Sequence, residues 1–75
     1  MKNDDHRLYE FRIKYNAHSD HSAMNSFHYY MAECAEDAVR FHEYALAHKN
    51  FHVQNISIER KNPWTFKWQK EDYEF

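Results

Sequence analysis

The chain has 75 residues and a mass of 9.3 kDa, which suffices for one small domain with a thin hydrophobic core. Its net charge is -2 and its pI is about 6.4, whereas nucleic-acid-binding domains usually have a pI above about 9. The 19% aromatic content favours a folded chain, the absence of glycine excludes glycine-rich phosphate-binding loops, and the single cysteine excludes an intrachain disulfide.

Residues 8–15 alternate between apolar and charged side chains, which predicts a strand with one face towards the core. We expect residues 1–6 to be disordered and the polar stretch 16–25 to form a loop. Alternation resumes over residues 26–32. The more apolar of its two faces predicts the inward side chains, so the expected core of both strands is Tyr9, Phe11, Ile13, Phe27, Tyr29 and Met31.

A helix is predicted over residues 35–49, with Asn50 as its left-handed end. Apolar side chains share one stripe at helical spacing, namely Cys34, Ala35, Ala38, Val39, Phe41, His42, Ala45 and Leu46. His42 lies in the middle of this stripe. We therefore expect a buried, neutral imidazole with one hydrogen-bond partner and a pKa below its ordinary value.

A third strand is predicted over about residues 55–60, with Ile56 and Ile58 facing inwards. Phe51 and Val53 have the opposite parity, which indicates an irregularity near residues 54 and 55. Pro63 ends this strand. Trp64, Phe66 and Trp68 then alternate with polar residues, a pattern that fits a short fourth edge strand or an apolar arm, and residues 71–75 are expected to fray.

These elements predict an α+β fold, a small β-β-α-β unit in a single domain. The crossover rule places the third strand parallel to the second, so the first strand lies between them and the antiparallel sheet has the order 2-1-3. One helix covers one face. The core spans residues 7–62, and residues 63–75 form a Trp-containing C-terminal arm.

Two residue clusters could carry chemistry. The loop residues His18, Asp20 and His21, with His28 or Asp37, offer zinc or nickel ligands, but their spacing matches no established metal site, so we expect no metal and no other cofactor. Cys34 begins the predicted helix, where a thiolate is favoured, but acidic neighbours oppose it and predict a structural cysteine. No enzymatic activity is expected.

The face of the sheet without the helix combines basic and aromatic side chains. We expect it to form a binding surface together with the C-terminal arm, through Arg12, Lys14, His28, Tyr30, Trp64, Phe66 and Trp68. The predicted function is a non-enzymatic protein-interaction module, a regulator or inhibitor that occupies a partner's surface. The alternative is single-stranded RNA or DNA binding on the open face. We further expect a homodimer that pairs through this face, and a cytoplasmic location.

Overall fold

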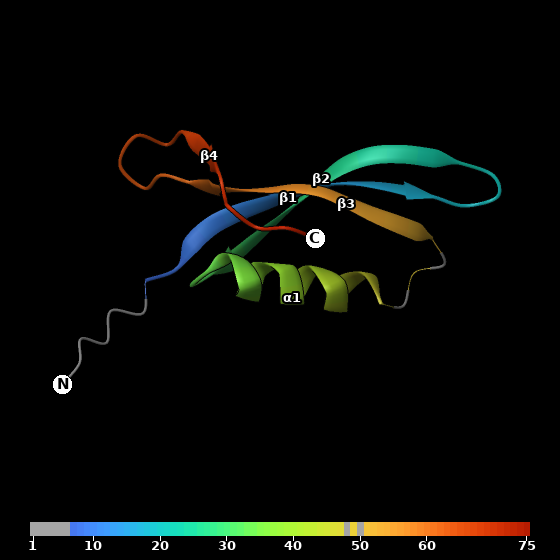
Figure 1. The fold of residues 1–75 in the computed structure, drawn as a ribbon, viewed down its shortest axis with the longest axis horizontal. Coiled ribbons are helices and arrows are strands. Elements are labelled where there is room, and N and C mark those ends of the chain that lie inside the picture. Colours follow the sequence, from blue (N-terminus) through green and yellow to red (C-terminus); the bar gives the residue numbers. More distant parts are fainter. Residues whose placement is uncertain (1–6, 48, 50) are drawn as a thin grey trace.

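The computed structural model describes residues 7–47, 49 and 51–75, in which four strands form one antiparallel sheet and one helix packs on one of its faces (Figure 1). The elements are β1 (Tyr9–His18), β2 (Ala23–Ala32), α1 (Ala35–Leu46), β3 (His52–Lys61) and β4 (Trp68–Lys70). The strand order is β2-β1-β3-β4, which confirms the predicted α+β class, the order 2-1-3 and the short fourth strand. The expected disorder of residues 1–6 and the Asn50 helix end lie outside the described residues.

The first two strands form a longer hairpin than the sequence predicts. Residues 16–18 and 23–25 continue the β1–β2 pairing without interruption, so the expected ten-residue loop is wrong. The hairpin closes at Ser19, whose backbone N–H donates to the Ser22 carbonyl oxygen over 2.8 Å, and the Ser19 hydroxyl accepts the N–H of His21. One backbone bond and the Ser19 side chain thus provide the local turn bonding in a chain without glycine.

The core lies between α1 and the centre of the sheet. β1 contributes Phe11 and Ile13, both fully buried, and β3 contributes Ile58 opposite Ile13. The helix adds Ala38 and Val39, and alanine lets its backbone approach the sheet closely. α1 ends at Leu46, three residues before the predicted end, and the N–H of Ala47 bonds back to the Tyr44 carbonyl oxygen.

The facing of β2 differs from the prediction. Phe11 pairs with Tyr30 and Ile13 with His28, and directly opposed residues of an antiparallel pair share a face. His28, Tyr30 and Ala32 therefore lie on the helix side. The expected core residues of this strand instead lie on the open side, with exposures of 38% for Phe27, 54% for Tyr29 and 55% for Met31.

β3 carries the irregularity that the sequence indicates, displaced slightly along the strand. Lys14 pairs with Ser57 and Tyr15 with Asn55, so Ile56 is the extra residue of a β-bulge. The bulge leaves Ile56 45% exposed, contrary to its expected core position, and brings Asn55 onto the helix side. The strand also begins earlier than predicted, at His52.

The C-terminal segment folds back onto the sheet. Asn62 organises the turn, because its side-chain oxygen accepts the backbone N–H groups of Trp64 and Thr65 over 2.8 and 2.9 Å. After β4, the N–H of Glu71 donates to the Ile58 carbonyl oxygen and Tyr73 packs against the core. The expected fraying of residues 71–75 is therefore wrong, and Figure 1 shows the chain end returning to the helix side of the sheet.

Phe66 gives a first testable prediction. Its φ of 61° lies in the left-handed region, which costs a non-glycine residue about 1–3 kcal/mol, and its side chain is 69% exposed. We expect Phe66→Gly to stabilise the fold by about 0.5–1 kcal/mol in urea unfolding. Thr65→Gly, one residue earlier in the same turn, is the control and should not stabilise. A loss of stability in Phe66→Gly would contradict the strain.

Candidate interaction surface

The open face of the sheet is built from cross-strand rows of side chains. The first row joins Met31, Glu10, Lys61 and Trp68; the second joins Tyr29, Arg12, Glu59 and Lys70; the third joins Phe27, Lys14 and Ser57. Apolar side chains therefore form a strip along β2, which we call the β2 strip and define as Phe27, Tyr29 and Met31. Charged side chains occupy β1 and β3 beside it.

Arg12 is the centre of this face. Its guanidinium lies 4.9 Å from the Phe27 ring centroid and 4.4 Å from that of Trp68, and its Nε donates to the Glu59 carboxylate. The hydrogen bond with Glu59 raises the pKa of Arg12 above its ordinary value. The rings of Tyr29 and Trp68 meet at 5.9 Å, so two strands that are not neighbours in the sheet are joined above Arg12.

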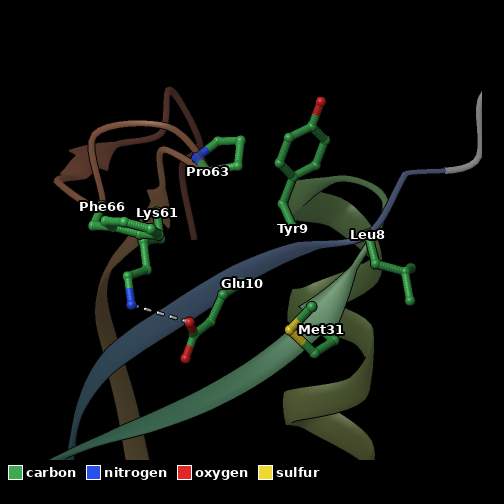
Figure 2. Close-up of a pocket in the computed structure, with 7 residues that line it drawn as sticks. All are labelled: Leu8, Tyr9, Glu10, Met31, Lys61, Pro63 and Phe66. Carbon is green, nitrogen blue, oxygen red and sulfur yellow. Dashed lines mark ion pairs between the residues drawn. The ribbon is translucent and has the colours of Figure 1, made fainter.

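A shallow pocket of about 230 Å³ continues the open face towards the C-terminal turn. Figure 2 shows the ion pair between Lys61 and Glu10, with Phe66 beside Lys61. The Lys61 ammonium lies 3.6 Å from the Glu10 carboxylate and 5.6 Å from the Phe66 ring centroid. Met31 and Leu8 line the other side of the pocket. The pocket thus extends the β2 strip with apolar side chains, while an ion pair lies at its floor.

Two of the predicted site residues lie on the helix side of the sheet. His28 and Tyr30 are expected on the open face, but both point towards α1, because their β1 partners are core residues, and both are half-buried. There they form part of a chain of hydrogen bonds, which we call the buried chain because its members Tyr15 and His42 are buried; it runs from Tyr15 through His28, Tyr30 and His42 to Asn55, with lengths of 3.0, 3.0, 2.8 and 2.8 Å.

The direction of this buried chain follows from its last member. The Asn55 side-chain oxygen can only accept, so His42 donates to it from Nε2 and accepts the Tyr30 hydroxyl at Nδ1. The Tyr30 oxygen then accepts from His28 Nδ1, and His28 Nε2 shares a hydrogen bond with the Tyr15 hydroxyl. Burial raises the pKa of Tyr30 to about 12, and burial also lowers the pKa of His42.

The sequence favours a packed Trp64 at the sheet edge, because Pro63 fixes its approach, and a Trp68 that is available to a partner, but the structure has the reverse. Trp64 is 73% exposed on the turn, with the Arg7 guanidinium 5.5 Å from its ring centroid, whereas Trp68 is half-buried against Arg12. Phe66 is exposed at the rim of the pocket. Arg12, Lys14, Trp68 and the pocket residue Phe66 therefore share the open side, whereas Trp64 lies on the turn beside Arg7.

The alternative chemistry has no geometric support among the residues that the structure describes. No group of three or more His, Cys, Asp and Glu side chains converges there to hold a metal. His28 lies in the interior, Asp37 pairs with Arg40 on the helix, and His18 stacks on His52. Cys34 is a half-buried free thiol before α1.

Comparisons with protein-family models, with curated proteins and with solved structures find no match to this chain. Among the described residues, no helix is long and apolar enough to cross a membrane.

Proposed function

We propose that this protein is a non-enzymatic interaction module that binds a partner protein on the open face of its sheet. The observation that supports this most is the exposure of the β2 strip, since three large apolar side chains lie in a line on one face of the sheet. Aromatic side chains and Arg are the groups that most often dominate protein interfaces. A reducing cytoplasm would suit the free thiol of Cys34.

The charge around the β2 strip indicates the chemistry of the partner. The three rows described above contain four cationic side chains but only two carboxylates, Glu10 and Glu59. Both carboxylates form ion pairs. Lys14 and Lys70 have no ion-pair partner within the described residues. We therefore propose a partner segment with an apolar anchor for the strip and acidic residues beside it.

A library of displayed random peptides tests this proposal. The expected peptides combine an aromatic or large aliphatic residue with neighbouring Asp or Glu, and Tyr29→Ala should weaken their binding at least about tenfold. Tyr44→Ala is the matched control, because Tyr44 is 78% exposed on the outer side of α1. Enrichment without acidic residues, or binding that survives Tyr29→Ala, would overturn the proposal.

Single-stranded nucleic acid is the second candidate, and the exposed Tyr29 ring favours it together with Lys14 and Lys70, which form no ion pair with any residue that the structure describes. Against it, the Arg12 guanidinium already covers Phe27 and Trp68 and is itself paired with Glu59. Salt titration of a labelled oligonucleotide separates the two. Binding to phosphates weakens with a log–log slope of about -0.7 per neutralised phosphate, whereas we expect no measurable oligonucleotide binding at physiological salt.

A further inference from the structure

The outer edge of β2 carries a row of backbone hydrogen-bonding groups that no strand of the described residues uses, although the Phe27 carbonyl oxygen accepts the Ser26 hydroxyl over 3.5 Å. Since Ser19 and Ser22 form a hydrogen-bonded pair and the β1–β2 register has no break, the even-numbered residues of β2 bond to β1. The odd-numbered residues direct their backbone N–H and C=O groups outwards; they are Ala23, Asn25, Phe27, Tyr29 and Met31. No strand pairs with this edge in the part of the chain that the structure describes.

Nothing in β2 blocks the edge. Its ten residues contain no Asp, Glu, Lys or Arg, no proline and no bulge, although edge strands usually carry such protection. The opposite edge of the sheet differs. β4 covers one end of β3, and the Ile56 bulge interrupts the rest. The longest run of backbone groups that is open to pairing with another strand therefore lies on β2.

We propose that β2 pairs antiparallel with β2 of a second copy of the chain, so that two four-stranded sheets join into one of eight strands. Directly opposed residues of an antiparallel pair lie on the same face of the sheet. The two-fold axis must therefore lie between one residue and its own copy in the partner strand. If that residue is Phe27, near the middle of the strand, then the nine residues 23–31 pair with the same nine residues of the second copy.

This register is self-complementary. On the open face it places Phe27 opposite its own copy, Asn25 opposite Tyr29 and Ala23 opposite Met31; on the helix face it places Ser26 opposite His28 and Met24 opposite Tyr30. No like charges meet, in contrast to face-to-face pairing, which would bring two surfaces with an excess of Lys and Arg together. The two β2 strips become one continuous apolar surface. A second copy therefore fits this edge better than the open face that the sequence suggests for dimerisation.

Light scattering of the full chain at high micromolar concentration tests the dimer, and no partner protein is needed. The expected mass is twice 9.3 kDa. Phe27→Lys opposes two ammonium groups on the axis, and Asn25→Pro removes one outward N–H without touching the β1 pairing, so both should give monomers with an unchanged circular dichroism spectrum. Tyr44→Lys is the control and should remain dimeric.

A cross-link checks the register. In a Cys34→Ser background, Phe27→Cys should form an interchain disulfide on mild oxidation, because the Cα atoms of a hydrogen-bonded pair are about 5.5 Å apart. Tyr44→Cys in the same background should not cross-link. A monomeric mass for the unmodified chain, a dimer that persists in both edge variants, or no disulfide from Phe27→Cys would overturn the proposal. Peptide binding on the open face is measured separately, so either proposal can fail alone.

Discussion

Acidification from neutral pH to about pH 5 is expected to destabilise this protein, and His42→Leu is expected to remove much of that dependence. His42 is fully buried between α1 and the sheet. Burial is the main cause that lowers its pKa below the ordinary 6.5, and the nearby His28 lowers it further, while the hydrogen bond to Asn55 and the Glu43 carboxylate act in the opposite direction. The net direction is downwards.

The sign of the pH effect follows from proton uptake. Below about pH 6.5 the unfolded chain binds a proton at residue 42 that the folded chain does not, so acid favours the unfolded state. The stabilisation by neutral His42 is present in full above that pH and is lost as the pH falls towards the folded pKa, where the dependence ends. Each pH unit in this window changes the free energy of unfolding by up to about 1.4 kcal/mol.

The hydrogen-bonded chain gives a structural reason for the same effect. A protonated His42 would carry hydrogen on both ring nitrogens, so Nδ1 could no longer accept the Tyr30 hydroxyl. The Tyr30 hydroxyl proton would then have no acceptor in this chain, because its other neighbour, His28 Nδ1, donates to the same oxygen. Protonation therefore breaks a bond in the interior as well as burying a charge.

Urea unfolding between pH 5 and pH 8 measures the effect. The slopes of the free energy of unfolding against pH are compared, not its absolute values, because His42→Leu also leaves Tyr30 and Asn55 without their imidazole partner. That loss lowers stability at neutral pH by about 1–3 kcal/mol. His21→Gln in the exposed β1–β2 turn is the matched control and should keep the parent profile. Parallel profiles for the parent and His42→Leu would assign the pH dependence to other groups.

The buried chain also explains where sequence-based prediction failed. β1 was placed correctly because its two faces differ sharply, with Phe11 and Ile13 on one side and Arg12 and Lys14 on the other. In β2 both faces are aromatic, and a hydropathy comparison favours Phe27 over His28. What reverses the preference is a set of partners on three other elements, Tyr15, His42 and Asn55, which satisfy the polar groups that β2 buries.

The same limit applies to the interaction surface. Arg12, Lys14 and Trp68 were identified from local alternation and do lie on the open side, but the β2 strip was assigned to the core and so was missed. Its exposure became visible only with the β1–β2 register. The signal in the sequence was the uncharged composition of residues 23–32 next to a strongly charged β1, which is unusual for an edge strand.

Trp68→Ala is expected to destabilise the fold by about 2 kcal/mol, below the 3–5 kcal/mol typical of a fully buried aromatic side chain. Trp68 is half-buried, contacts the Arg12 guanidinium and the Tyr29 ring, and lies in β4, so its loss removes packing and a cation–π contact together. Trp64→Ala should change stability by less than about 0.5 kcal/mol, since Trp64 is 73% exposed. The sequence favoured the reverse assignment, with Trp64 packed and Trp68 free.

Fluorescence-monitored urea unfolding of the two variants decides between these assignments, because the chain contains two tryptophans and each variant retains one. The emission of Trp64→Ala reports Trp68 and should be blue-shifted in the folded state, whereas the emission of Trp68→Ala should resemble that of the unfolded chain. A larger stability loss in Trp64→Ala, or equal emission maxima, would contradict the packing of β4 against Arg12. If Trp68→Ala also weakens peptide binding more than its effect on folding explains, then Trp68 both holds β4 in place and contacts the partner, which is what its position beside Tyr29 predicts.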